Sequence, residues 1–250
     1  MASRAPGALM ERETFLARVR RGLSGVEAPP LPGELPVTPA SDDGRPLPQR
    51  FSEELRAVGG VVELVSRADL AGAVAAAAES VEVATAVIGP DVERFAEPVR
   101  EGLRRAGVEI LQPEGPEAWR EAGVRADLGV TGALAGVASS GSILASAGPA
   151  SSRLASLLPP NHLVVLPAER LVPGFEELFA ELPGNVEGAS SSVLITGPSR
   201  TADIEMVLVR GVHGPRHVHV LLVEEPRRSS TRRGRPAKRA GPPGASSLRP

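Results

Sequence analysis

Hydrophobic and polar positions in the middle of the chain follow two alternating patterns: short β-branched runs, and longer segments with helical spacing. The short runs predict strands over Gly60–Val65, Val83–Ile88 and Val108–Leu111. The longer segments predict helices over Arg67–Glu79, Asp91–Ala106 and Glu117–Ala122. Strand and helix at this spacing are typical of parallel βαβ units. The pattern therefore predicts an α/β fold with a mainly parallel sheet flanked by helices.

After Arg125 the apolar runs lie closer together. They predict further strands over Asp127–Gly132, Gly141–Ser146, His162–Pro167 and Val218–Val223. Between them, Arg153–Leu158 predicts one or two helical turns and Leu171–Leu182 predicts a longer helix. The second half is thus expected to add strands to the same kind of sheet.

One stretch, from Ser192 to Val209, combines three local signals. Val193–Ile195 predicts a buried strand, Thr196, Gly197, Pro198 and Ser199 break it, and Thr201–Arg210 resumes with helical spacing. Ser199 or Thr201 would cap that helix, with Asp203 and Glu205 near its positive end. With Arg200 in the turn, the stretch predicts an anion-binding cradle. The alternative is an ordinary capped turn between a strand and a helix.

Composition divides the chain into four parts. Residues 1–27 contain a short amphipathic helix, Glu13–Leu23, expected to dock on the body, and residues 28–50 form a Pro- and Gly-rich linker. The α/β domain is expected over residues 51–225. Residues 226–250 are basic, contain no acidic residue and predict a disordered tail. That tail is interpreted as a solvated extension, with nucleic-acid contact as the alternative.

The residue counts, the net charge and the lengths of the apolar runs exclude several classes of function. The 250-residue chain has no cysteine, so it carries no disulfide, thiolate nucleophile or cysteine-ligated cluster of its own. A net charge of −2 argues against a protein whose whole surface binds nucleic acid. The absence of a long apolar run and of a signal-peptide pattern predicts a cytoplasmic protein without membrane contact.

The candidate acid/base groups are few. His213, in the Gly- and Pro-shaped loop after the stretch from Ser192, and Glu205 are the catalytic candidates, with a loop histidine bonded to backbone as the alternative for His213. His162 is interpreted as fixing a strand entrance. His217 and His219 share one strand face, but no clear third ligand accompanies them, so we expect solvent-facing residues and no metal site.

Small polar residues supply the candidate binding groups. Ser140 and Gly141 lie in a turn of small residues between Ser139 and Ser142, which predicts either a hydroxyl and amide surface for a ligand or tight packing of helix on strand. Asp203 either holds Arg200, caps backbone amides or belongs to the site. The predicted anion-accepting cleft comprises Thr131, Gly132, Ser140, Gly141, Thr196, Gly197, Ser199, Arg200, Thr201 and Asp203.

Several motifs occur together in a fixed order. They are Gly129-Val-Thr-Gly132, Arg153-Leu-Ala-Ser-Leu-Leu-Pro-Pro160 with His162, Ile195-Thr-Gly-Pro-Ser-Arg-Thr-Ala-Asp-Ile-Glu205 and Gly211-Val-His-Gly-Pro215. This set resembles the lactate utilisation protein C family, also called the LUD-domain proteins. The resemblance is strongest from Leu128 to Glu224 and extends back to Gly60.

The resemblance implies a fold related to ribose-5-phosphate isomerase, glucosamine-phosphate deaminase and CoA-transferases. It also implies a role with two iron–sulfur partner proteins in oxidising L-lactate to pyruvate, with the clusters in the partners and no cofactor in this chain. Where the family often has an aspartate and a glutamate, this chain has Leu134 and Ser139. That departure argues against covalent acyl-CoA chemistry or acid/base work at those positions.

Three functions are weighed on these grounds. The preferred one is an accessory or anionic-ligand-binding subunit of a lactate-oxidising system. The second is a stand-alone enzyme acting on a small phosphorylated or CoA-linked metabolite, with His213 or Glu205 as its acid/base. The third, ranked last, is a nucleic-acid-associated protein that uses the basic tail.

Overall fold

The computed structural model describes residues 12–26, 43–147, 152–185, 189, 191–202 and 208–225. The chain divides into two units, residues 1–38 and residues 39–250. In the first, helix α1 spans Arg12–Gly22, close to the predicted Glu13–Leu23. Its docking stays a prediction. Most of the predicted linker and the whole basic tail lie outside the described residues.

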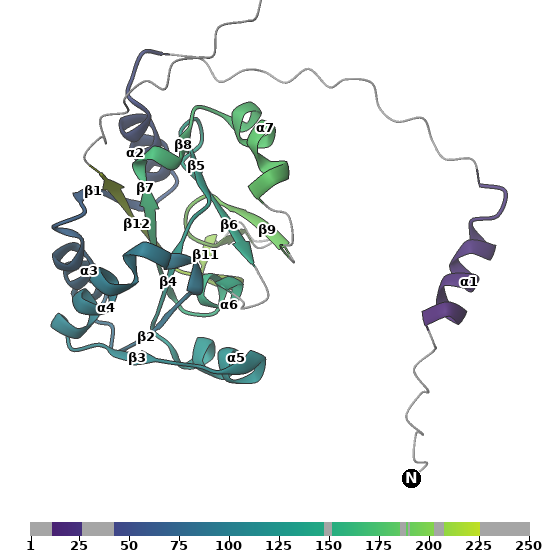
Figure 1. Cartoon of the computed structure of the whole chain (residues 1–250), viewed down its shortest axis with the longest axis horizontal. Helices are drawn as coiled ribbons and strands as arrows, with labels where there is room; N and C mark the ends of the chain where they lie inside the picture. The colour runs from purple at the N-terminus through teal and green to yellow at the C-terminus, as the bar shows by residue number, and fades with distance from the viewer. Residues whose placement is uncertain are drawn as a thin grey trace, which may run out of the picture. The chain divides into compact units, whose positions relative to one another are not determined.

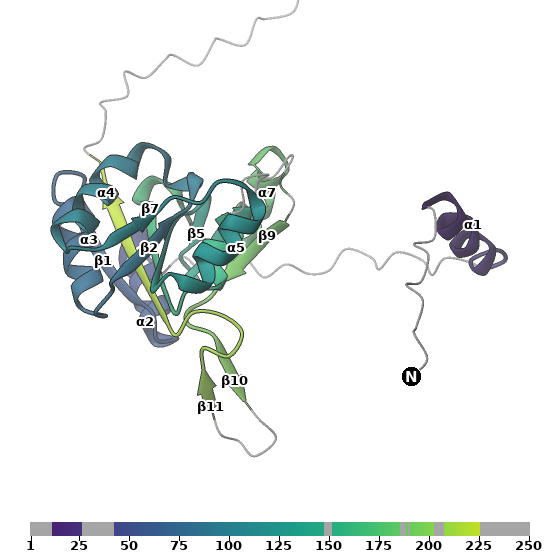
Figure 2. The same cartoon turned by 90° about the horizontal axis from the view of Figure 1, so that it is seen from below.

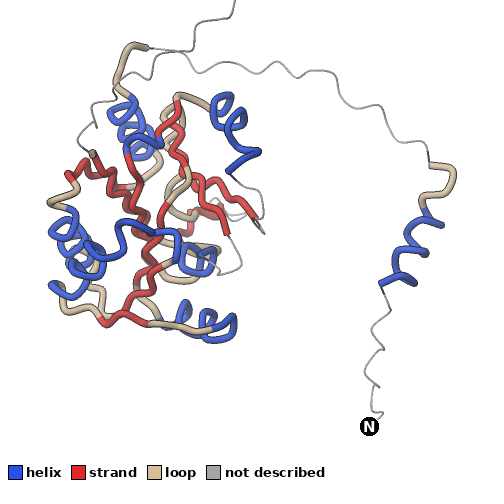
Figure 3. The backbone as a smooth tube through the Cα atoms, viewed as in Figure 1, coloured by secondary structure: helices blue, strands red, loops and turns tan. Residues whose placement is uncertain are grey.

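The second unit contains a six-stranded parallel sheet of order β1-β12-β7-β4-β2-β3. Its strands are β1 (Val61–Ser66), β2 (Thr85–Ile88), β3 (Glu109–Leu111), β4 (Leu128–Gly132), β7 (Asn161–Pro167) and β12 (His217–Glu224). Figure 1 shows these strands side by side, and Figure 3 shows helices around them. The predicted α/β fold with a mainly parallel sheet is confirmed.

The two central strands, β4 and β7, are buried on both faces because both faces are covered. Along β7, Leu163 and Val165 enter one core, while Val164 and Leu166 enter the other. The first core is completed by α3 (Leu70–Glu79) and α4 (Ala96–Arg105). These helices approach closely, since a Cβ at Gly102 would lie 2.5 Å from the Ala71 carbonyl oxygen.

A second, smaller sheet covers part of the other face. It has the order β8-β5-β6-β9, with strands β5 (Ala135–Val137), β6 (Ser142–Ala147), β8 (Leu171–Val172) and β9 (Ser191–Ile195). Only its β5–β8 pairing is parallel. Its core contains Ile143 and Leu171 together with Phe51 and Leu55 from α2 (Leu47–Ala57).

The remaining helices complete this unit. They are η1 (Pro90–Phe95), α5 (Gly115–Arg125), α6 (Ser152–Leu157), η2 (Ala168–Arg170) and α7 (Phe175–Asn185). On the face opposite α3 and α4, α5 and α6 pack with Ala122 and Ala155 against Val87 of β2. In the described part of the chain, no helix has both the length and the apolar character needed to cross a membrane.

Several element boundaries differ from the sequence predictions. Helix α2 begins at Leu47, inside the stretch interpreted as linker, and was not predicted. Its burial comes from contacts with distant segments, which a local pattern does not contain. The predicted helix Asp91–Ala106 is divided into η1 and α4, and Leu171–Leu182 into β8 and α7. Strand β9 is not buried as predicted, because alternate residues such as Leu194 face outward.

The predicted helix over Thr201–Arg210 is wrong. Strands β10 (Arg200–Ala202) and β11 (Leu208–Arg210) pair antiparallel there, with Thr201 opposite Val209. Figure 2 shows this hairpin projecting beside the end of the large sheet at which β12 begins. β-branched residues such as Thr201 and Val209 fit a strand pair as well as a short helix. The proposed helix caps and the helix dipole at Ser199 and Thr201 therefore do not exist.

Candidate functional site

The large sheet has a topological switch point between β2 and β4. From β2 the chain passes through η1 and α4 to β3, on one side, whereas from β4 it passes through the small sheet and α6 to β7, on the other. Connections that leave neighbouring parallel strands in opposite directions open a crevice beyond their carboxyl ends. Ligands of open α/β sheets bind at such crevices.

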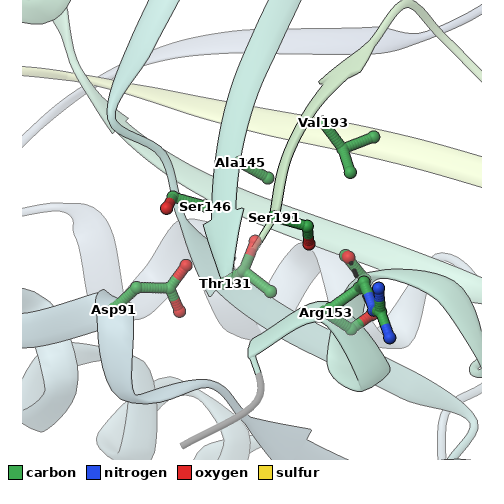
Figure 4. A pocket seen from close by; sticks show the side chains of 8 residues that line it. Asp91, Thr131, Ala145, Ser146, Arg153, Ser191 and Val193 are labelled. Atoms are coloured by element: carbon green, nitrogen blue, oxygen red, sulfur yellow. Dashed lines mark hydrogen bonds between the residues drawn. The ribbon is translucent and has the colours of Figure 1, made fainter. Parts of the chain in front are cut away.

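A cleft lies at this point and is shown in Figure 4. We call it the switch-point cleft; it is lined by Asp91, Thr131, Ala145, Ser146, Arg153, Ser156, Ser191 and Val193. Figure 4 shows Asp91 and Arg153 on opposite sides of Thr131. The enclosed part of the cleft has a volume of about 10 Å³, about enough for one water molecule, so a larger ligand would lie at its open mouth, beside the exposed Arg153.

The backbone at the carboxyl ends of β2 and β4 is closely packed. The Gly89 amide donates to the Val130 carbonyl at 2.7 Å. A Cβ at Gly132 would lie 2.1 Å from the Asp91 carbonyl oxygen, so only glycine fits there. This contact holds Asp91 at the end of β4, next to Thr131.

The Thr131 hydroxyl group is hydrogen-bonded to a buried histidine. Its Oγ1 lies 2.8 Å from Nε2 of His162, and both side chains are almost completely buried. Burial lowers the pKa of His162 to about 4, because removal from water disfavours the charged imidazolium. His162 is therefore neutral at pH 7, and its Nδ1 has no hydrogen-bond partner among the described residues.

The cleft combines one guanidinium with several hydroxyl groups. Arg153 is exposed at the start of α6, where the Ser156 hydroxyl donates to the Arg153 carbonyl at 3.0 Å. The Ser191 hydroxyl is buried and has no hydrogen-bond partner in the described part of the chain. A guanidinium beside hydroxyl groups can bind a carboxylate or a phosphate, and Asp91 can accept a hydrogen bond from a hydroxyl group of the same ligand.

A second polar cluster lies at the other end of the β6–β9 pair. The hydroxyl groups of Ser140, Ser142 and Thr196 form a chain, with 2.8 Å between neighbouring oxygen atoms at each step. We call this the hydroxyl chain. Gly141 has a φ of +63°, and a Cβ there would lie 2.3 Å from the Leu55 amide nitrogen. The turn thus packs directly on α2.

The predicted cleft residues therefore fall into two groups. Ser140, Gly141, Thr196 and Gly197 come together at the hydroxyl chain, and Arg200 donates from there to the Val58 carbonyl at the end of α2. Thr131 and Gly132 lie at the switch-point cleft instead. Along β6, Ser142 of the hydroxyl chain and Ser146 of the switch-point cleft are four positions apart, or roughly 13 Å of strand. The two groups do not line one common cleft.

The remaining predicted residues lie near the hydroxyl chain or outside the description. The Ser199 amide donates to the Pro215 carbonyl at 2.9 Å, which ties the turn to the loop that carries His213. His213 is exposed and makes no hydrogen bond or ion pair with described residues. The side chain of Thr201 is not described, and Asp203 and Glu205 lie outside the described residues.

The last histidines lie at the amino end of β12. The prediction that His219 faces solvent is wrong. Its side chain is 16% exposed, and its Nε2 lies 3.0 Å from Oε1 of Glu63. Burial lowers the pKa of His219, and the Glu63 carboxylate opposes that shift. His217 is exposed. In the described ranges, no three or more histidine, aspartate or glutamate side chains are grouped so as to hold a metal ion.

Sequence reasoning did not assign Asp91, Ser146, Arg153, Ser156 and Ser191 to a site. Two signals were available. Asp91 lies three residues after the predicted strand Val83–Ile88, near a strand end where parallel sheets carry their functional side chains. Arg153 and Ser156 lie in one of the motifs that support the family resemblance.

Known proteins resemble this chain in sequence and in fold. A lactate utilization protein C from an Exiguobacterium species is 41% identical over 114 residues, which cover 44% of this chain and 50% of the relative. One from Halalkalibacterium halodurans is 36% identical and covers 49% of this chain and 55% of the relative. In these two comparisons the chain spans about half the length of its relatives. One from Deinococcus radiodurans is 28% identical over 86% of this chain and 95% of the relative.

The fold has a solved counterpart. The crystal structure of a DUF162 family protein from Deinococcus radiodurans matches with a TM-score of 0.52, at 24% identity, over 71% of this chain and 96% of that protein. The family model for the LUD domain matches residues 48–223, from α2 to the end of β12. Because that match covers most of the chain and all strands of the large sheet, the protein belongs to the LUD domain family.

Proposed function

We propose that this protein is a LUD-domain component of a lactate-utilisation system, in which L-lactate is oxidised to pyruvate together with iron–sulfur partner proteins. The observation that carries the proposal is the family match over residues 48–223, with relatives named lactate utilization protein C. The oxidation removes two electrons and two protons from lactate. Cysteine-bound clusters of the partners accept the electrons, since this chain has no cysteine.

Within that system, the protein acts as an accessory subunit that binds a small anionic ligand. The switch-point cleft is the better of the two polar clusters for this role. Arg153 is exposed there, beside the Thr131 and Ser191 hydroxyl groups, whereas Arg200 donates to the Val58 carbonyl. A carboxylate of the ligand would pair with the Arg153 guanidinium, and Asp91 would accept a hydrogen bond from a neighbouring hydroxyl group of the ligand.

Partners are tested by anaerobic affinity purification of the tagged protein from its own cells grown on lactate, followed by mass spectrometry and an iron assay. We expect two cysteine-rich, iron-containing proteins to co-purify. An iron-free protein, recovered alone both from these cells and after chemical cross-linking, would contradict the subunit role.

The ligand site is tested by calorimetric titration with L-lactate and with pyruvate. We compare Arg153→Gln with Arg200→Gln, which makes the same change at the other cluster. Loss of roughly tenfold or more in affinity at Arg153 alone supports the switch-point cleft. The same loss at Arg200 alone would move the site to the hydroxyl chain, and an unchanged affinity in both variants would exclude both clusters.

A further inference from the structure

A larger cavity lies beside the switch-point cleft, beyond the carboxyl ends of β2 and β3. Its volume is about 380 Å³, within the range of roughly 300–1,000 Å³ typical of small-molecule sites. We call it the Trp119 cavity; it is lined by Ile88, Gly89, Pro90, Ala96, Arg100, Ile110, Leu111, Gln112, Pro113, Glu114 and Trp119. Pro90 lines this cavity and Asp91 lines the cleft, so one backbone segment separates the two.

Trp119 gives the cavity an aromatic wall. It is the only tryptophan of the chain and projects from α5. The indole is partly buried and packs, with Leu111, against the core cluster that contains Val87 and Ala122. A ring held on one side and open to a cavity on the other offers a surface on which a planar ligand ring can stack.

Arg100 gives the cavity a positive charge. Helix α4 carries three arginines, and the other two are paired along its outer surface: Arg104 with Glu97 and Glu101, and Arg105 with Glu101. Among the described residues, Arg100 makes no ion pair and no hydrogen bond, and it lines the cavity. Its guanidinium is thus available for the anionic group of a ligand.

The rim adds hydrogen-bonding groups of a different kind. Glu114 and Gln112 follow β3, at the opening of α5. A carboxylate accepts hydrogen bonds from paired sugar hydroxyl groups, as it does in dinucleotide-binding sheets, but it repels additional phosphate groups. The cavity therefore suits a ligand with an aromatic ring, hydroxyl groups and a single anionic group.

We propose that the Trp119 cavity binds a nucleoside monophosphate, with the base stacked on Trp119, the ribose hydroxyl groups at Glu114 and the phosphate at Arg100. A nucleotide bound there would contact Gly89 and Pro90, next to the residue that lines the switch-point cleft.

The chain offers a direct probe, because it has one tryptophan and no tyrosine, so its fluorescence reports on Trp119 alone. The full-length protein is titrated with AMP, adenosine, ribose 5-phosphate and inorganic phosphate, with excitation where the nucleotides do not absorb. We expect AMP to quench the fluorescence saturably and adenosine to do so with roughly tenfold weaker affinity. A protein that does not respond to AMP in fluorescence or calorimetry would overturn the proposal, as would phosphate or ribose 5-phosphate binding as tightly as AMP.

Two matched substitutions on α4 locate the phosphate. Arg100→Gln should weaken AMP binding by roughly tenfold or more, whereas Arg104→Gln, one helical turn away and facing Glu97, should leave it unchanged. Equal affinity of the two variants would overturn the assignment. Thermal unfolding of both variants confirms that each is folded before it is titrated. Arg100→Gln is also titrated with L-lactate, and its lactate affinity should equal that of the parent protein, because Arg100 does not line the switch-point cleft.

Discussion

Nε2 of His162 on β7 lies 2.8 Å from Oγ1 of Thr131 on β4, with both side chains buried in the sheet. The pair joins the core to the floor of the switch-point cleft, because Thr131 also lines that cleft. A buried imidazole with a low pKa stays neutral and fixes the hydroxyl group in place. Stability and site geometry therefore depend on the same contact.

The free energy of unfolding should decrease as the pH is lowered, because of His162. Its pKa is lowered from 6.5 to about 4 in the folded protein, so between these values the unfolded chain binds the proton more tightly. The contribution is complete above pH 6.5 and is lost as the pH falls towards 4, by on the order of 3 kcal/mol. Urea denaturation at a series of pH values measures this loss.

The substitution His162→Gln isolates this histidine. Glutamine can hold the Thr131 hydroxyl group but does not titrate, so the variant should lose less stability between pH 6.5 and 4 than the parent protein. His213→Gln, at an exposed histidine, is the matched control and should keep the parent slope. His219, whose pKa burial also lowers, continues to contribute in both variants. Equal slopes in all three proteins would contradict the assignment to His162.

Thr131→Val should destabilise the protein by about 1–3 kcal/mol, because it removes the hydrogen-bond partner of a buried imidazole nitrogen. The double variant Thr131→Val with His162→Leu should recover part of that loss, since an apolar pair leaves no polar atom unsatisfied. Chemical denaturation of the two single variants and the double variant measures the coupling. Strictly additive effects would show that the contact contributes nothing to stability.

Gly141→Ala should be one of the most damaging small changes in the chain. The residue has a φ of +63°, and the new Cβ would lie 2.3 Å from the Leu55 amide nitrogen. We expect a loss of roughly 2–5 kcal/mol, from left-handed strain plus displacement of α2. Gly107→Ala controls for the strain, since Gly107 has a φ of +71° and its new Cβ would have no neighbouring atom within 4 Å. Similar melting temperatures for both variants would disprove the packing argument.

The hydroxyl chain predicts coupling between β6 and β9. Ser142 is 1% exposed, and its hydroxyl group bridges Ser140 and Thr196. Ser142→Ala should cost about 1–2 kcal/mol, and a double-mutant cycle with Thr196→Val should show a coupling energy of about 0.5–1.5 kcal/mol. The cycle is measured by urea denaturation. A coupling energy of zero would mean that the two hydroxyl groups act independently.

The error at Thr201–Arg210 shows where local patterns stop being informative. The spacing of apolar residues there fits a helix, and the same residues include β-branched side chains that fit a strand. Strand pairing decides between helix and strand here, because Arg200–Ala202 and Leu208–Arg210 form hydrogen bonds with each other's backbone groups as a hairpin. A single-sequence pattern does not contain that partner.

Sequence alone determined the strands of the large sheet and the α/β class, because its strands are short, mainly apolar runs and each βα repeat is local in the chain. Tertiary structure decided which polar residues meet. Asp91, Thr131, Arg153 and Ser191 come from η1, β4, α6 and β9, and the predicted cleft residues were divided between two ends of β6. Chain crossings and the packing of the small sheet on the large one bring these segments together, and neither leaves a local signal in the sequence.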